Sequence, residues 1–171
     1  MTRLFGRIEL IANLCIIALA IVIGGLLAKR FHFKSPEKLS DVSISAGTKV
    51  TLQDIDWSKN DKTLLLVIST QCKFCSASAS FYRQLATNAE ILQKAKVVAL
   101  LPQSVQEGRG YLRSLDVPID DIRQVSPSAI GVKATPTLIL VNNSGTVTDS
   151  WVGQLQADKE AEVLAKLKLT L

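Results

Sequence analysis

The stretch that decides the fold, "VISTQCKFCSASASFYRQLA", spans Val67–Ala86. It holds Cys72 and Cys75, two residues apart, where an apolar run gives way to a segment with helical spacing. The apolar run, residues 63–69, has the length and composition of a strand that is buried on both faces. The cysteines therefore lie between a buried strand and the start of a helix that we expect over residues 75–92.

Three interpretations of this cysteine pair compete. Two inert buried thiols fit poorly, because the dipole and free amides of a helix start favour thiolate over thiol. A structural zinc site needs four ligands, and the chain adds only Cys15, in an apolar segment, and His32; two-coordinate Cu(I) binding by the pair stays open. Dithiol–disulfide exchange, in which an exposed first sulfur attacks and the second resolves, is the interpretation that the sequence favours.

Strands and helices alternate along the rest of the chain. We expect a short edge strand in residues 49–57, strands over 95–102, 122–125, 136–142 and 146–153, a helix over 103–115, a short turn or helix at 128–132 and a terminal helix over 157–169. Asn142–Gly145 is a tight-turn signal between the last two strands. This order predicts an α/β domain with parallel crossovers, in which the closing hairpin makes the sheet mixed.

An uncharged run, "LIANLCIIALAIVIGGLLA", covers residues 10–28. As a helix it would be about 28 Å long, which matches a bilayer core of about 30 Å. The rival is a cleaved signal peptide, but its small-x-small site, Ala18–Ala20, lies inside the apolar run. We expect an uncleaved membrane anchor in residues 1–30, with its span at about 10–28. A tether over residues 31–44 then leads into a domain over residues 45–171.

The net charge of +5 belongs mainly to the N-terminal segment. Residues 1–38 carry six basic and two acidic side chains, whereas residues 39–171 carry fourteen and thirteen. The globular part has no positive excess for nucleic acid, so we expect no nucleic-acid partner. Basic residues after the apolar run outnumber those before it, which by the positive-inside rule alone favours a cytoplasmic domain.

Three segments carry a specific resemblance: "LLLVISTQCKFC" (64–75), "GVKATPTLILVNNSGTV" (131–147) and "WVGQL" (151–155). Together they resemble the thioredoxin superfamily, most of all the membrane-anchored, extracytoplasmic TlpA/ResA-like thiol–disulfide oxidoreductases. The likeness covers roughly residues 45–171. It implies an α/β, thioredoxin-like fold with a mixed central sheet flanked by helices, preceded by one N-terminal transmembrane helix.

The resemblance also implies roles for residues. Cys72 would be the attacking thiol and Cys75 the resolving one. Thr135 would offer backbone hydrogen bonds to a bound substrate strand, and Pro136, in a cis peptide bond, would shape that groove. No cofactor and no metal are expected.

Lys73 and Phe74, the two residues between the cysteines, each allow two interpretations. Lys73 is either a solvated charge or, if it lies near the sulfur, a group that stabilises the thiolate. Phe74 is an apolar contact for a partner if it is exposed, and otherwise part of the core. On the functional interpretation, both residues belong to the substrate-binding surface.

The chain departs from the family at three places. Gln71 stands where the family usually has Trp before the first cysteine. Leu66 stands where thioredoxins have a buried Asp, and residues 76–78 are Ser-Ala-Ser where some members have a Glu. The resemblance therefore supplies no proton acceptor for Cys75.

We expect a single-pass protein of the plasma (inner) membrane with its domain on the extracytoplasmic side, because long domains translocate largely regardless of flanking charge. Its partners would be protein dithiol or disulfide substrates and a redox partner. The alternatives are a non-catalytic thioredoxin-fold docking module, a Cu(I)-binding chaperone and a peroxiredoxin-like peroxidase. The last would need a proline where this chain has Leu65.

Overall fold

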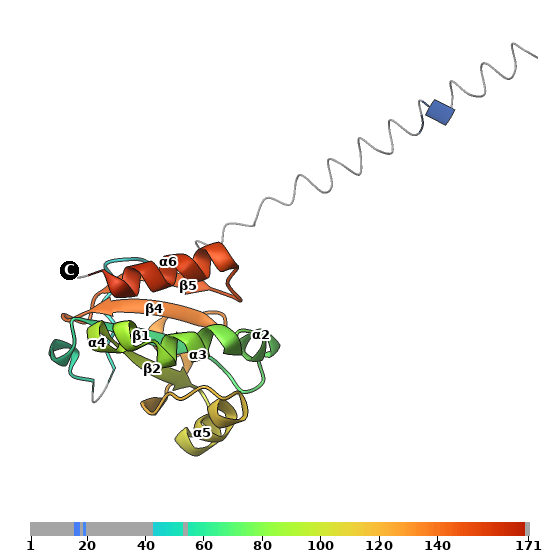
Figure 1. Cartoon of the computed structure of the whole chain (residues 1–171). Coiled ribbons are helices and arrows are strands. Elements are labelled where there is room, and N and C mark those ends of the chain that lie inside the picture. Colours follow the sequence, from blue (N-terminus) through green and yellow to red (C-terminus); the bar gives the residue numbers. More distant parts are fainter. Residues whose placement is uncertain (1–15, 18, 20–42, 53–54, 170–171) are drawn as a thin grey trace, which may run out of the picture. The chain divides into compact units, whose positions relative to one another are not determined.

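A five-stranded mixed sheet, in the order β3-β2-β1-β4-β5, organises the domain. The computed structural model describes residues 16, 17, 19, 43–52 and 55–169 (Figure 1). The strands are β1 (Lys62–Val67), β2 (Ala95–Leu101), β3 (Ile122–Gln124), β4 (Thr137–Asn142) and β5 (Val147–Val152). The helices are η2 (Trp57–Lys59), α2 (Lys73–Ala77), α3 (Ala79–Thr87), α4 (Ala89–Lys94), α5 (Val105–Ser114), η3 (Pro127–Ile130) and α6 (Ala157–Lys168).

Strand β1 occupies the centre of the sheet and fixes where the cysteines lie. It pairs in parallel with β2 and antiparallel with β4, and all six of its residues are buried. Strand β3 adds to β2 in parallel, and β5 returns antiparallel along β4. The carboxyl end of the central strand and the start of β4 therefore meet at one edge of the sheet, since Val67 pairs with Thr137.

The described long helices cover one face of the sheet, as Figure 1 shows for α3, α4 and α6. Their apolar positions pack on the alternate strand residues that point to that face, because side chains along a strand alternate between the faces. This first core cluster includes Leu64, Leu66, Cys75, Phe81, Tyr82, Leu85, Ile91, Leu112, Val163 and Leu167. One of the two motif cysteines is therefore part of the hydrophobic core.

The opposite face is covered by irregular chain and the short η3 helix. Leu65, Val67 and the other strand residues of this face pack against the segment that contains Ile44 and Val50. Ile44, at the end of the predicted tether, is buried, and its carbonyl accepts a hydrogen bond of 2.8 Å from Ser150 Oγ. The second core cluster is Ile44, Val50, Leu65, Val67, Val98, Leu100, Val132, Ile139, Val141 and Val147.

The α/β order with a mixed sheet is confirmed, but two predicted elements differ. The helix expected over residues 75–92 is divided into α2, α3 and α4. Asn88 has extended backbone and its Oδ1 accepts from the amide of Ile91, so the side chain begins a new helix instead of continuing the old one. The edge strand expected in residues 49–57 was wrong for the described residues of that segment, where only Lys49 forms an isolated bridge, to Thr146.

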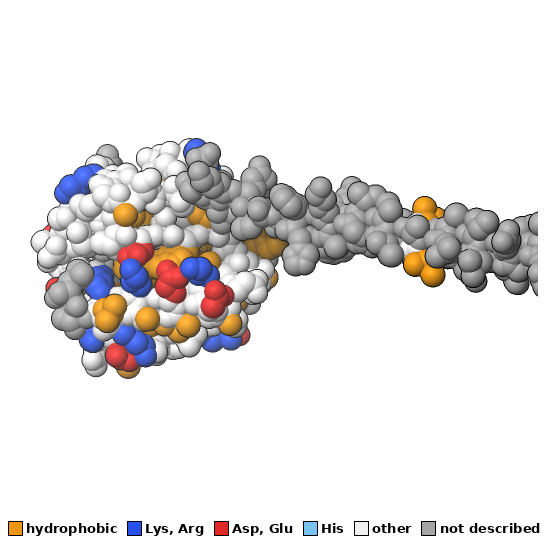
Figure 2. Space-filling model, turned by 90° about the horizontal axis from the view of Figure 1, so that it is seen from above, with side chains coloured by type: hydrophobic (Ala, Val, Ile, Leu, Met, Phe, Trp, Pro, Cys, Tyr) orange, Lys and Arg blue, Asp and Glu red, His pale blue; other side chains and the backbone are white. Residues whose placement is uncertain are grey.

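The predicted membrane span lies outside the described residues except for Ile16, Ile17 and Leu19, which are helical and exposed. Among the residues that the structure describes, no helix has both the length and the apolar character that crossing a bilayer requires. On the domain, lysine and arginine side chains lie among aspartate and glutamate side chains on the face shown in Figure 2.

Candidate active site

The two cysteines lie at the start of α2, just after the central strand. Cys72 is the N-cap residue, with extended backbone, and its sulfur accepts a hydrogen bond of 3.3 Å from the amide of Cys75. The loop before it is held by Gln103, whose Nε2 donates to Ser69 Oγ across 3.2 Å. A side chain from the β2–α5 connection therefore fixes the approach of the chain to Cys72.

The two sulfurs differ in exposure. Both cysteines are free thiols; Cys72 is partly exposed, whereas Cys75 is fully buried in the first core cluster. A partner can reach only the first sulfur from outside, and the second can react only with a group that Cys72 already holds. This asymmetry is the arrangement expected for an attacking and a resolving thiol.

The pKa values of the two thiols move in opposite directions. Burial raises the pKa of Cys72, but hydrogen bonds with the Cys75 side chain and with Thr135, and with the amides of Cys75 and Phe74, outweigh it and leave the pKa below its ordinary value. Burial raises the pKa of Cys75 to about 12, and its hydrogen bond to Cys72 adds to the rise. Cys72 is thus the thiol of the pair that loses its proton more readily, and the thiolate is the reactive form of a cysteine.

Thr135 and Pro136 lie directly opposite the first sulfur. The Cys72 thiol donates a hydrogen bond of 3.3 Å to the carbonyl oxygen of Thr135. The Thr135–Pro136 peptide bond is cis, and the carbonyl of Pro136 accepts a bond of 2.7 Å from the amide of Gly153. A hollow of about 300 Å³ adjoins this loop, lined by residues 126–128 and 132–135. The loop that the sequence singled out therefore contacts Cys72 through Thr135, and the same residue lines the hollow.

Phe74 points outward beside the reactive sulfur. Its side chain is 50% exposed, which is high for a large apolar residue, and the Lys73 ammonium lies 5.1 Å from the centroid of its ring. Lys73 is not among the largest influences on the pKa of Cys72. Of its two interpretations, the structure thus favours a solvated charge that stacks on the aromatic ring over a group that stabilises the thiolate.

Four hydroxyl groups near the cysteines were not singled out from the sequence. Ser76 Oγ and Tyr111 Oη form a hydrogen bond of 3.0 Å near the surface, whereas Ser78 and Tyr82 are buried. Ser78 and Tyr82 follow Cys75 by three and seven residues, which is the spacing of one helix face. That spacing was available in the sequence, whereas the link between Ser76 and Tyr111 joins two helices and was not.

Carboxylates and metal-ligand clusters do not adjoin the dithiol in the described part of the chain. The position six residues before Cys72 is the buried Leu66, and the largest influences on Cys75 are burial, Cys72 and groups of Ser69 and Thr135. Within the described ranges, no three His, Cys, Asp or Glu side chains lie close enough to hold a metal ion.

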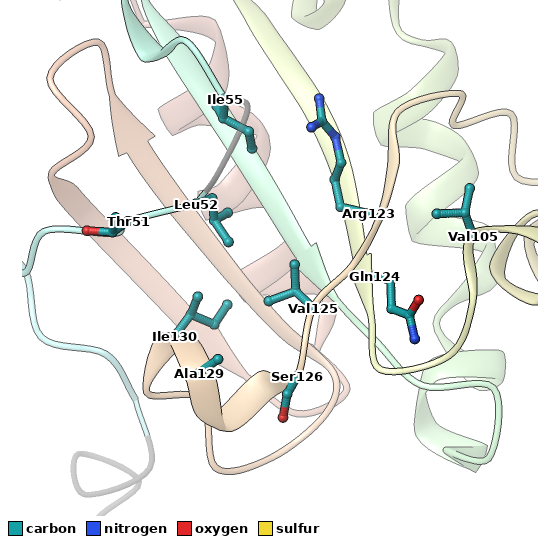
Figure 3. Close-up of a pocket in the computed structure, with 10 residues that line it drawn as sticks. All are labelled: Thr51, Leu52, Ile55, Val105, Arg123, Gln124, Val125, Ser126, Ala129 and Ile130. Carbon is teal, nitrogen blue, oxygen red and sulfur yellow. The ribbon is translucent and has the colours of Figure 1, made fainter.

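A larger cavity of about 470 Å³ lies on the other face of the sheet and contains neither cysteine. Figure 3 shows Leu52, Ile55, Val125 and Ile130 gathered around it. It belongs to the second core cluster, whose residues flank it. The candidate chemistry is therefore at the dithiol, where Thr135 contacts Cys72 and also lines the smaller hollow.

Solved structures resemble this arrangement of strands and helices. A candidate thiol:disulfide interchange protein DsbE from Chlorobium tepidum matches with a TM-score of 0.54 and 23% identity, over 72% of this chain and 99% of that one. The thioredoxin domain of a thiol-disulfide oxidoreductase from Bacteroides vulgatus matches with 0.55 and 12%, over 74% and 99%. The exposed lipoprotein thioredoxin Etrx1 of Streptococcus pneumoniae matches with 0.52 and 20%, over 65% and 86%.

No protein-family model and no curated protein sequence matches the chain. At the identities of the matched structures, the likeness establishes the fold. The resemblance seen in the sequence is confirmed at that level, with a mixed sheet flanked by helices and with Cys72 and Cys75 at the junction of the central strand and a helix. The domain of this chain therefore has the thioredoxin-like fold.

Proposed function

We propose that the protein is a membrane-anchored thiol–disulfide oxidoreductase that exchanges disulfides with protein partners through Cys72 and Cys75. One observation carries the proposal: a partly exposed thiol of lowered pKa lies against a fully buried thiol of raised pKa. An inert buried pair would lack the first property, and a docking module would need neither.

The exchange proceeds in two displacements, each of which conserves atoms and electrons. The Cys72 thiolate attacks one sulfur of a substrate disulfide, and the other substrate sulfur leaves as a thiolate and takes up a proton. Cys75 then loses its proton and attacks the Cys72 sulfur, which forms the Cys72–Cys75 disulfide and releases the second substrate sulfur. Two electrons pass from the dithiol to the substrate. The reverse sequence oxidises a substrate dithiol, and a redox partner resets the pair.

The surface around Cys72 suits a polypeptide substrate. An extended segment in the hollow beside Thr135 and Pro136 would lie within reach of backbone groups at the cis bond. The exposed ring of Phe74 would cover an apolar side chain next to the reacting cysteine, and Lys73 would lie at the edge of that contact. Displacement at sulfur by a neighbouring thiolate needs no further cofactor.

The matched structures support this proposal by their descriptions. They include a thiol-disulfide oxidoreductase domain, a candidate thiol:disulfide interchange protein and an exposed lipoprotein thioredoxin. The match to this protein covers 86% or more of each of these three chains. The proposed activity therefore concerns the part of the chain that shares their fold.

The uncharged run over residues 10–28 supports the proposed anchor, with the domain on the extracytoplasmic side of the plasma membrane. Full-length protein should stay with membranes after a carbonate wash and keep its original N-terminus. A reporter fused after Leu171 should be active only in a form that requires export. A mature N-terminus near residue 21 or 29 would overturn the anchor, and activity of a cytoplasm-only reporter would overturn the topology.

Trapping of a mixed disulfide tests the activity itself. Full-length protein with Cys75→Ser, expressed in its native membrane, should form a partner adduct through Cys72 that a reductant releases on a gel. The double variant Cys72→Ser/Cys75→Ser is the matched control and should trap nothing. Equal adducts in both variants, or none in either, would contradict the proposal. Tight Cu(I) binding or rapid reaction with peroxide by an otherwise inactive protein would instead favour the chaperone or the peroxidase.

A further inference from the structure

The buried resolving thiol needs help that no carboxylate in the described part of the chain gives. In the second displacement, Cys75 has to become a thiolate inside the first core cluster, where burial raises its pKa to about 12. Leu66 and the side chains of residues 76–78 are not carboxylates. A group that stabilises negative charge on the Cys75 sulfur would therefore speed the step.

Tyr82, in the first core cluster, carries a buried hydroxyl. Its side chain is 1% exposed, and its hydroxyl has no hydrogen-bond partner among the described residues. Buried polar groups are nearly always paired, and an unpaired one at a candidate site calls for an explanation. The neighbouring Ser78 hydroxyl lies near enough to lower the pKa of Tyr82. The proton of the Ser78 hydroxyl, however, is already donated to the carbonyl of Phe74 across 2.9 Å.

The helix directs the Tyr82 side chain toward Cys75. Cys75, Ser78 and Tyr82 are spaced by three and four residues, and all three are buried. Ser78 caps both α2 and α3, and backbone bonds bridge the join: the amide of Ser78 donates to the carbonyl of Phe74 and the amide of Tyr82 to that of Ser78. Helical side chains lean toward the N-terminus, so a long ring at Tyr82 extends back over the preceding turn, on the face of the sulfur.

Electrostatics gives independent support for this proximity. Burial raises the pKa of Tyr82 above its ordinary value, and after the opposing influence of Ser78, the groups that raise it further are Cys75, Tyr111 and Cys72. Tyr82 therefore remains protonated near neutral pH and keeps a proton that it can donate in a hydrogen bond. Tyr111, on α5, is already joined to Ser76 by a hydrogen bond of 3.0 Å.

We propose that the Tyr82 hydroxyl donates a hydrogen bond to the Cys75 sulfur as it becomes a thiolate and so takes the place of a neighbouring carboxylate in the resolving step. The proposal rests on the proposed exchange activity. The proton that Cys75 loses ends on the departing substrate thiolate, so the step balances without an added base. Tyr82 keeps its own proton throughout. The hydroxyl is unpaired in the dithiol form because the charge that it serves has not yet formed.

The test follows the two displacements separately on the reduced full-length protein, with Cys15 replaced by Ser, in detergent. The probe is 5,5′-dithiobis(2-nitrobenzoate), an aryl disulfide that releases one coloured thiolate when Cys72 attacks and a second when Cys75 resolves. Tyr82→Phe should slow the second release by at least about tenfold, the scale of a lost hydrogen bond to a charged group. It should leave the first release unchanged. Tyr111→Phe removes a hydroxyl that is already paired, and it is the matched control.

A second readout does not depend on turnover. In a Cys72→Ser background, the ultraviolet absorbance of the Cys75 thiolate should develop at higher pH with Phe at position 82 than with Tyr. Thermal unfolding of Tyr82→Phe should show no loss of stability, since an unpaired buried hydroxyl contributes none. Unchanged second release and unchanged Cys75 titration in a folded Tyr82→Phe protein would overturn the proposal, as would equal slowing by Tyr111→Phe.

Failure of the exchange activity has a different signature. If Cys72 and Cys75 form no functional dithiol, the first release is slow in every variant and the second is absent in the parent protein. If only the role of Tyr82 is wrong, the parent and the Tyr82→Phe variant show the same two releases. The two failures are therefore distinguishable in one experiment.

Discussion

The backbone amide of Cys75 donates a hydrogen bond to the sulfur of Cys72 across 3.3 Å. The same bond begins helix α2, because the sulfur accepts at the N-cap position where serine or aspartate oxygens commonly do. It also favours the thiolate of Cys72, since a charged sulfur accepts more strongly than a neutral one. The start of the helix and the activation of the nucleophile therefore have one physical cause.

Alkylation should distinguish the two thiols. With iodoacetamide, labelling of Cys72 should set in at lower pH than that of an ordinary cysteine, because hydrogen bonds hold the pKa of Cys72 below its ordinary value. Labelling of Cys75 should stay negligible until the pH approaches its pKa of about 12 or the protein unfolds. Mass spectrometry of digested protein locates each adduct. Modification of Cys75 before Cys72 at neutral pH would reverse the assigned roles.

Phe74 should matter for protein substrates and not for small ones. Phe74→Ser should lower kcat/KM for a protein disulfide by about 5- to 10-fold, because part of an aromatic contact area is lost. Exchange with glutathione should be unchanged, since glutathione is too small to need the ring. Leu92→Ser is the matched control: Leu92 is 51% exposed against 50% for Phe74, but it lies on α4, next to the start of β2 and away from Cys72.

An equal loss with Leu92→Ser would show that general surface polarity, rather than a contact at the active site, determines the rate. No loss with Phe74→Ser would remove this residue from the proposed substrate-binding surface. Neither substitution should change the free energy of unfolding by more than about 0.5 kcal/mol, the usual range for surface positions.

The turn between β4 and β5 offers a test of packing against the second core cluster, to which Trp57 adds its ring. Gly145 has φ +75°, and a Cβ there would lie 2.9 Å from Cδ1 of Trp57. Gly131 has nearly the same φ, +76°, but open space around it. Gly131→Ala should cost about 1–2 kcal/mol for the left-handed backbone alone. Gly145→Ala should cost about 1–3 kcal/mol more, because the ring of Trp57 has to move. Chemical denaturation measures both, and equal losses would show that the ring yields freely.

Much of this fold could be predicted from the sequence because its central strands are continuous apolar runs. The predicted ranges 63–69, 95–102 and 136–142 each match a strand to within two residues at either end. A strand buried on both faces is a continuous apolar run, a signal that does not depend on periodicity. The turn at Asn142–Gly145 could also be predicted, from its residue types.

Other features depended on contacts that the sequence does not display. The helix is divided at Asn88 because the Asn88 side chain accepts a hydrogen bond from the amide of Ile91 and so begins a new helix. The apolar residues keep their helical spacing across this position, so the sequence does not show the division. The exposure of Phe74 depends on which way the first turn of α2 faces. The unpaired hydroxyl of Tyr82 became visible only when its neighbours were known. Local patterns thus predicted the elements and the cysteine pair, whereas tertiary packing determined the groups around that pair.

The central claim is that Cys72 and Cys75 form one reversible dithiol–disulfide couple. Equilibrating the full-length protein with glutathione buffers of graded potential, followed by acid quenching and mass spectrometry, measures it directly. We predict a single two-electron transition, with both thiols lost together, at a midpoint between roughly −270 and −120 mV. The account would be contradicted if both thiols persisted across that range, or if they yielded only separate glutathione adducts and no Cys72–Cys75 disulfide.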